Sequence, residues 1–163
     1  MEAMVASLLA YLGGENDPEA PVRADLAVLA ATIVDDAADR GLAASYDGPE
    51  HCEVTFRPVA LKRAIGNLVD NAIHYGGSAM VSIAVEDAEV TIRVEDDGPG
   101  IAEDKLADAL APFTRLDPAR GRNTTGLGLG LTIVQRAVER EGGSLRLVNR
   151  PTGGLCAEIV LPR

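Results

Sequence analysis

Two asparagines and a histidine follow one line along a predicted helix. Within LKRAIGNLVDNAIHYG, residues 61–76, helical spacing places Asn67, Asn71 and His74 on one face. Carboxamide oxygens and an imidazole suit a hydrated Mg²⁺ and a polyphosphate better than a soft metal. Because asparagine is tolerated on exposed helix faces, this segment alone fits a binding helix and an ordinary surface helix equally well. Its apolar residues form the opposite, core-facing stripe: Leu61, Ile65, Leu68, Ala72 and Ile73.

A second candidate site is the acidic turn EDDGPG, which follows a predicted strand. Gly98 and Gly100 lack the Cβ atoms that would keep a ligand away from the backbone. An ionised Asp96 can accept a hydrogen bond from an exocyclic amine, such as that of adenine. The same residues also make a sound turn, and taken alone they favour that simpler interpretation.

A third candidate site is the glycine-rich run TTGLGLGLTIV. Gly126, Gly128 and Gly130 lead into a predicted helix, where free backbone N–H groups and the helix dipole can face phosphate. The usual phosphate motifs fit poorly. A dinucleotide-binding GxGxxG needs a strand directly before it, and the lysine of a P-loop is missing.

The segment between these last two sites, residues 101–127, has little apolar periodicity. Its length is typical of a lid or of disorder. A lid over a polyphosphate would account for its cations, although solvated loop charge is an alternative for all except Arg115. The cations are Lys105, Arg115, Arg120 and Arg122. Phe113 either anchors the lid or packs in the core.

Composition limits the remaining possibilities. The chain has 163 residues, 47% hydrophobic and 3% aromatic, which predicts one α/β domain with an aliphatic core and a short appendage. A net charge of −10 argues against a nucleic-acid surface or a basic membrane patch. Cys52 and Cys156 lack metal-ligand spacing, so we expect buried thiols. No leader or membrane helix is evident, which favours a cytoplasmic segment and leaves open whether a longer parent protein is anchored.

The periodic patterns predict three main helices, over 25–40, 59–75 and 130–141, with Pro58 at the start of the second. Strands are predicted at 42–46, 53–56, 79–85, 90–95, 144–148 and 155–161, the third and fourth forming a hairpin. Residues 1–12 predict a short amphipathic helix. Because so short a helix is marginal in water, we interpret it as the tail of a longer helix that packs in a bundle, with self-association or docking on the core as the alternative. Residues 15–21 predict a polar linker.

Four of these segments, in order, resemble the N, G1, F and G2 boxes of a known domain. They are NLVDNAIHYG, EDDGPGI, APFTRLD and TGLGLGLTIV. The domain is the catalytic ATP-binding domain of two-component sensor histidine kinases (HATPase_c, Bergerat fold). The resemblance covers residues 22–163, while residues 1–14 resemble the end of the dimerisation and phosphotransfer domain that precedes it. It implies an α/β two-layer sandwich, with a mixed, mostly antiparallel sheet covered on one face by three helices and a more polar face opposite.

The resemblance also implies ATP and Mg²⁺ as cofactors. Asn71 would ligate Mg²⁺, Asn67 would support the ion or a phosphate during catalysis, and Asp96 would read the adenine amine. The other implied nucleotide contacts are His74, Tyr75, Gly98, Gly100, Gly126, Gly128, Gly130 and Leu131. Arg115 matches a lid arginine that stabilises charge on the γ-phosphate. His74 departs from the usual Lys or Arg, so nucleotide affinity is expected to be lower or more pH-dependent.

The implied reaction is phosphoryl transfer from ATP to a histidine on a separate dimerisation domain, with a response regulator downstream. His51 and His74 lack the H-E/D-x-R/K-x-P context of the family's acceptor, so the chain is not expected to phosphorylate itself.

Three alternatives remain. An ATP hydrolase of this fold carries a carboxylate where Asn67 stands. An anti-sigma-factor serine kinase tolerates His74 but tends to have glutamate at the position of Asn67. A degenerate adaptor would not need Asn71, Asp96 and the three glycines.

Overall fold

The computed structural model describes residues 18–110 and 130–163, together with Val5, Leu8 and Leu9. Those three residues are helical and exposed, as expected of the helix predicted over 1–12. The rest of that segment lies outside the described residues. Within the described ranges, no helix has the length and apolar character needed to cross a membrane.

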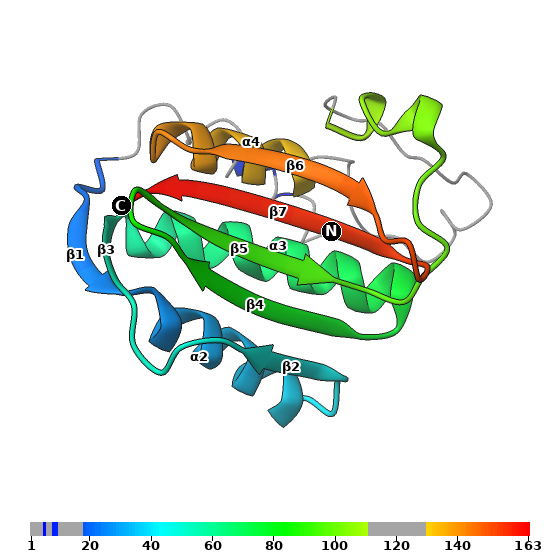
Figure 1. The fold of residues 1–163 in the computed structure, drawn as a ribbon, viewed down its shortest axis with the longest axis horizontal. Coiled ribbons are helices and arrows are strands. Elements are labelled where there is room, and N and C mark those ends of the chain that lie inside the picture. Colours follow the sequence, from blue (N-terminus) through cyan, green and yellow to red (C-terminus); the bar gives the residue numbers. More distant parts are fainter. Residues whose placement is uncertain (1–4, 6–7, 10–17, 111–129) are drawn as a thin grey trace.

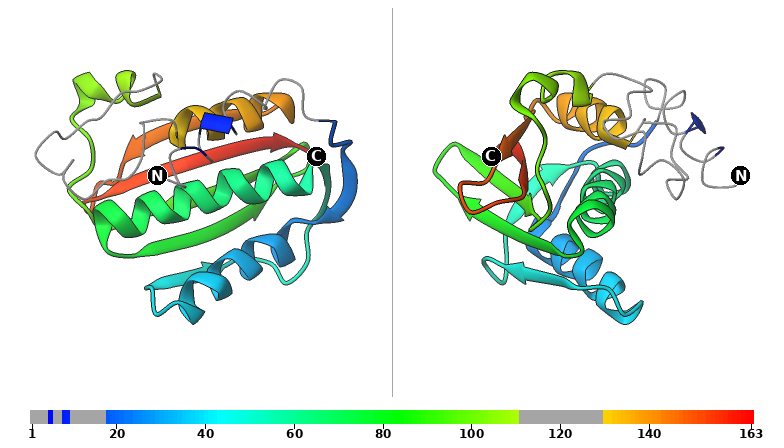
Figure 2. Two further views of the ribbon diagram at one scale, coloured as in Figure 1. Left: turned by 180° about the vertical axis from the view of Figure 1, so that it is seen from behind. Right: turned by 90° about the vertical axis from the view of Figure 1, so that its right-hand side faces the viewer.

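The domain is a two-layer sandwich built on a five-stranded sheet (Figure 1). The strand order is β2 (Ala44–Asp47), β4 (Ala79–Val85), β5 (Glu89–Glu95), β7 (Leu155–Pro162) and β6 (Ser144–Asn149). Strand β2 runs parallel to β4, and the other neighbours are antiparallel. Helices α2 (Leu26–Asp39), α3 (Pro58–Gly76) and α4 (Gly130–Arg140) cover one face of this sheet (Figure 2). The predicted fold class is therefore confirmed.

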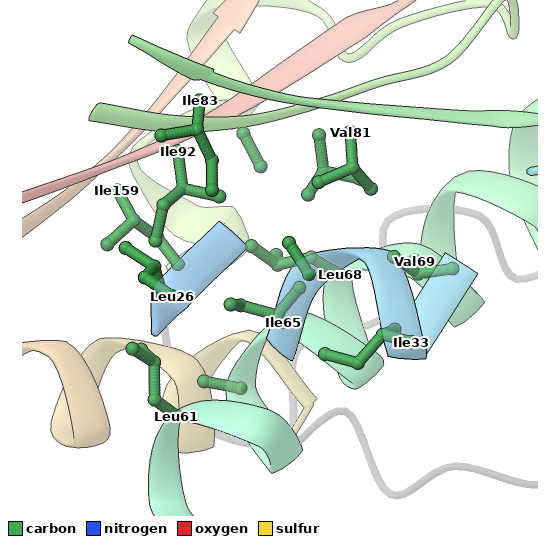
Figure 3. Packing of buried hydrophobic residues seen from close by; sticks show 14 of the residues in the cluster. Leu26, Ile33, Leu61, Ile65, Leu68, Val69, Val81, Ile83, Ile92 and Ile159 are labelled. Carbon is green, nitrogen blue, oxygen red and sulfur yellow. The ribbon is translucent and has the colours of Figure 1, made fainter. Parts of the chain in front are cut away.

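The hydrophobic core lies between the sheet and the three helices. Leu61, Ile65 and Leu68 of α3 face Ile92 and neighbouring residues of the sheet (Figure 3). Val69 is also buried, at 1% exposed, although it lies outside the predicted stripe. The reason is that α3 lies between α2 and α4, so its apolar face must be wider than one stripe. Ile73, predicted as core, is only partly buried.

The structure corrects the prediction at the start of the domain. A four-residue strand, β1 (Val22–Asp25), pairs with β3 (Glu53–Phe56) in a separate two-stranded sheet. The sequence did not predict β1. The predicted strand over 42–46 begins instead at Ala44, because the Leu42 amide donates to Ala37 O and still belongs to the end of α2.

Asp25 starts helix α2. Its Oδ1 accepts hydrogen bonds from Ala27 N at 3.1 Å and Val28 N at 3.2 Å, and from Cys52 N at 3.0 Å. Its Oδ2 lies 2.7 Å from Nδ1 of His51. The hydrogen bonds from Cys52 and His51 lower the pKa of Asp25 to about 2. One carboxylate therefore caps α2 and fastens it to the chain that enters β3.

The sheet face away from the helices is the more polar one, as predicted. Glu158 of β7 accepts from Arg93 Nε at 2.8 Å and from Arg146 on the other neighbouring strand. The hydrogen bonds from Arg146 and Arg93 lower the pKa of Glu158. Cys52 and Cys156 are buried free thiols, also as predicted, and burial raises the pKa of Cys156 to about 11.

The first turn of α3 is capped by a side chain that is distant in the sequence. Arg57 provides no side-chain cap, and Pro58 brings no N–H group. Instead, the Glu19 carboxylate accepts from Val59 N at 2.8 Å and Ala60 N at 3.0 Å. Glu19 belongs to the segment predicted as a linker, so at this residue the linker is docked on the domain.

Arg57 joins this cap to the end of α4. Its Nε donates to Glu19 O at 3.0 Å, and its Nη1 donates to Arg140 O at 3.0 Å. Nη1 also lies 3.4 Å from Oε1 of Glu141, whose side chain is only 5% exposed. The entering chain, the start of α3 and the end of α4 are thus tied together by one guanidinium.

We expect Arg57→Met to lower the free energy of unfolding by about 3 kcal/mol, because it leaves the buried Glu141 carboxylate without its charged partner. Arg23→Met is the matched control. Arg23 and Glu53 are exposed to 68% and 62%, and such surface pairs contribute about 0–1 kcal/mol. Urea unfolding at neutral pH measures both variants, and equal losses would contradict the assignment.

Candidate nucleotide-binding site

The face of α3 that carries Asn67 and Asn71, called the asparagine face, lies toward the start of α4. Asn67 and Asn71 are half-buried, and His74 is exposed. A Cβ atom added to Gly130, the first residue of α4, would lie 3.7 Å from Nδ2 of Asn71. The structure therefore brings together the predicted magnesium ligand and the last glycine of the glycine-rich run. Leu131 packs against the hydrophobic core, so its predicted nucleotide contact remains a prediction.

Asp96 lies where β5 ends, and it is 7% exposed. Its Oδ1 accepts hydrogen bonds from Gly98 N at 2.9 Å and from Leu155 N at 3.1 Å. Its Oδ2 makes no hydrogen bond to another described residue. One oxygen of the carboxylate thus shapes the turn, while the other is an acceptor available to a donor on a ligand.

Glycines allow three segments to meet around Asp96. A Cβ atom added to Gly76, at the end of α3, would lie 2.6 Å from the Asp96 Cβ. One added to Gly98 would lie 2.9 Å from Tyr75 O, and one added to Gly154 would lie 1.9 Å from Asp96 O. Gly76 and Gly154 were missed from the sequence, where they read only as a helix end and a turn.

Gly100 makes room for a protein side chain, whereas the sequence had predicted that its missing Cβ serves a ligand. Its φ is +71°, and an added Cβ would lie 2.5 Å from Oδ1 of Asn149. Asn149 forms a two-point contact with Ile101. Its Oδ1 accepts from Ile101 N at 2.9 Å, and its Nδ2 donates to Ile101 O at 2.6 Å. No spacing pattern in the sequence indicated this contact.

His74 and Tyr75 form the last turn of α3. Their rings contact edge to face, with centroids 4.8 Å apart and an interplanar angle of 86°. Tyr75 is 45% exposed, and its backbone carbonyl lies against Gly98. Both rings therefore lie at the end of α3 where Asp96 is found, and their nucleotide contacts stay a prediction.

Part of the predicted lid can be described. Residues 101–110 contain two short 3₁₀ turns, η1 (Glu103–Lys105) and η2 (Asp108–Leu110). Thr132 of α4 donates its hydroxyl to Leu110 O at 3.2 Å, which joins η2 to α4. Phe113, Arg115, Arg120, Arg122, Gly126 and Gly128 lie outside the described residues.

The described groups fit an adenine nucleotide and a hydrated divalent cation. The turn at Asp96 supplies a carboxylate acceptor beside glycine backbone, which is the complement of an amine on a flat base. Asn71 and Asn67 supply neutral oxygens beside a helix start, which suits Mg²⁺ together with phosphate. The two sets lie at the same end of α3.

Comparison with known proteins identifies the class. The family model of histidine kinase-, DNA gyrase B- and HSP90-like ATPases matches residues 56–163, more than half of the chain, and the chain belongs to this family. Within the family, it is the ATP-binding catalytic domain of a sensor histidine kinase.

Individual relatives support this assignment. Sensor histidine kinase GtrS of Pseudomonas aeruginosa is 45% identical over 107 residues, which are 66% of this chain and 22% of GtrS. The chain therefore spans about a fifth of that relative. The ATP-binding domain of PrrB from Mycobacterium tuberculosis has a TM-score of 0.72 at 27% identity, covering 87% of this chain and 96% of that one. The histidine kinase domain of Escherichia coli EnvZ has a TM-score of 0.66 at 38% identity, covering 88% and 90%.

We expect Gly76→Ala to weaken ATP binding at least about tenfold, because the added methyl group must displace Asp96. Gly66→Ala, on the same helix, is the matched control. A Cβ atom there meets nothing within 4 Å, so affinity should be unchanged and stability should rise by about 0.5–1 kcal/mol. Calorimetric titration and urea unfolding measure the two quantities. Normal ATP affinity in Gly76→Ala would contradict the placement of the base at Asp96.

Proposed function

We propose that this chain binds ATP with Mg²⁺ through Asn71, Asp96 and Gly130, and transfers the γ-phosphoryl group to a histidine on a separate dimerisation domain. The observation that carries the proposal is that the two oxygens of the Asp96 carboxylate have different surroundings. Its Oδ1 is taken by Gly98 N and Leu155 N, which orients Oδ2 toward a ligand. A base with an exocyclic amine satisfies that oxygen.

At the adenine end, Asp96 accepts the amine, and Gly98 lets the end of α3 pack closely against the turn that carries Asp96. Tyr75, half-exposed at the end of α3, contributes an aromatic wall. Gly100 acts indirectly, because it admits the Asn149 side chain that holds Ile101.

At the phosphate end, Asn71 ligates the cation and Asn67 supports the ion or a phosphate one helical turn away. When bound, Mg²⁺ neutralises charge on the phosphates during transfer. Gly130 presents the N-terminus of α4 to the phosphates. His74 stands where the family usually has Lys or Arg, so we expect it to hold the phosphates less firmly than a fixed cation would. Arg115, Gly126, Gly128 and Leu131 keep the roles predicted from the sequence.

The phosphoryl acceptor is supplied by another part of the protein. The chain has two histidines. His51 uses Nδ1 for Asp25, and His74 lies on the nucleotide face of α3. The partners are therefore a histidine-bearing dimerisation domain and a downstream response regulator. We place the domain in the cytoplasm, where ATP is available, with no nucleic-acid partner because the net charge is −10.

ATP binding tests the nucleotide site directly. We expect Mg²⁺-dependent binding in calorimetric titration, weakened at least about tenfold by Asp96→Asn, which places an amide beside the adenine amine. Asn71→Ala should remove the dependence on Mg²⁺. Asp70→Asn is the matched control, since Asp70 neighbours Asn71 but is 62% exposed, and its ion pair within the described part of the chain is the long one with Arg40 at 3.8 Å. Absence of binding at millimolar ATP would overturn the proposal in favour of an adaptor.

Phosphoryl transfer is tested by supplying the acceptor. With γ-labelled ATP, the chain alone should gain no acid-labile phosphate. A histidine-bearing dimerisation domain of a related kinase, added separately, should become labelled on its histidine as ADP is released. Stoichiometric acid-labile phosphate on the isolated chain would contradict the division of labour between the two domains.

A further inference from the structure

We propose that Arg150, in the turn between β6 and β7, is a positioning residue for adenine selection. It clamps the segment Glu95–Asp97 so that the Asp96 carboxylate faces the 6-amino group of the base. The inference rests on the proposed ATP site, and it concerns a turn to which the sequence assigned no function. In Figure 1 this turn lies at the end of the sheet where β5 and α3 finish.

Arg150 contacts three consecutive residues. Its Nη1 donates to Asp96 O at 2.7 Å and to Asp97 Oδ1 at 2.8 Å. Its Nε lies 3.4 Å from Oε1 of Glu95. The side chains of Arg150 and Glu95 are only 20% and 23% exposed, so this pair is not a loose surface pair, whereas the Asp97 side chain is 76% exposed.

Arg150 contacts the side chains of Glu95 and Asp97 but only the backbone of Asp96. Strand β5 ends at Glu95, and Asp96 and Asp97 continue the chain into the turn. Arg150 takes the carboxylates of Glu95 and Asp97 and the carbonyl between them. The guanidinium therefore holds the backbone of Asp96 and leaves the Asp96 carboxylate to Gly98 N, Leu155 N and a ligand.

The turn that carries Arg150 is itself firmly built. Arg150 N donates to Gly154 O at 2.9 Å, and Gly153 N donates back to Arg150 O at 3.1 Å. The next strand then begins at Leu155, whose N–H reaches Oδ1 of Asp96 at 3.1 Å. Arg150 and Leu155, the two ends of one turn, thus act on Asp96 through its carbonyl and its carboxylate.

Charge gives a second reason for an arginine here. Glu95, Asp96 and Asp97 place three carboxylates in sequence, and their mutual repulsion opposes an ordered turn. A planar guanidinium with several donors can engage two carboxylates and a carbonyl together, which a lysine cannot do with the same geometry. Loss of the Arg150 guanidinium would let the turn move, and Oδ2 of Asp96 would no longer be held in one direction.

The test separates positioning from general stability by comparing two bases. ATP carries the 6-amino group and ITP carries an oxygen in its place, so the ratio of their dissociation constants reports whether Asp96 is correctly aimed. Titration calorimetry with Mg²⁺ is carried out on the full chain, Arg150→Met, Arg150→Lys and Arg146→Met. Arg146 is the matched control because it lies on β6 but pairs with Glu158 on the polar sheet face.

We expect the unmodified chain and Arg146→Met to prefer ATP by at least about tenfold. Arg150→Met should weaken ATP binding by about tenfold and change ITP binding less than twofold, so that the ratio approaches one. Arg150→Lys should give an intermediate ratio, and it serves as the deciding variant if Arg150→Met does not fold.

Contrary results have distinct meanings. An unchanged ratio in the Arg150 variants, or equal weakening of both nucleotides, would show a structural role only and would overturn the inference alone. Equal binding of ATP and ITP by the unmodified chain would overturn adenine reading by Asp96. Failure of the unmodified chain to bind either nucleotide would overturn the proposed function itself.

Discussion

The two backbone hydrogen bonds to Oδ1 of Asp96 are the contacts on which the binding end of this domain depends. One comes from Gly98, two residues away, and the other from Leu155 at the start of β7. Together they order the acidic turn and attach it to the sheet at β7. The close packing of Gly76, Gly98 and Gly154 follows from this arrangement, because any added Cβ atom would collide with Asp96 or its neighbours. Glycine at these positions is therefore required by the close packing around the Asp96 carboxylate.

Helix α3 connects this turn to the rest of the molecule. Its core face fills the space between α2, α4 and the sheet, and its asparagine face meets the start of α4. At its first turn, Glu19 and Arg57 tie it to the entering chain and to the end of α4. The two helices that carry the proposed phosphate-binding groups are consequently in contact at both ends. Their relative position is set by packing and ion pairing rather than by the nucleotide alone.

The features that could be predicted from the sequence are those that depend on local residue patterns. The helix carrying Asn71 could be predicted from its apolar periodicity and Pro58, and the turn at Asp96 could be suspected from the glycines around it. Strand β1 could not, because four residues without clear alternation find their partner in β3 only through the fold. Val69 was missed because its burial depends on two neighbouring helices. Asn149 and Arg150 were missed because they bind backbone atoms about fifty residues away in sequence, and such contacts impose no spacing that a reader of the sequence could detect.

The cap on α3 also has a consequence for distance. Glu19 fixes the entering chain at Val59 and Ala60, whereas Asn71 lies some three turns further along the same helix, about 18 Å at 1.5 Å per residue. Under the proposed function, a histidine-bearing domain joined through that chain would connect at the end of α3 opposite the proposed phosphate site. It would then have to span this length of helix to present its histidine to the phosphates. The position of one helix cap thus sets the distance that the proposed phosphoryl transfer must span.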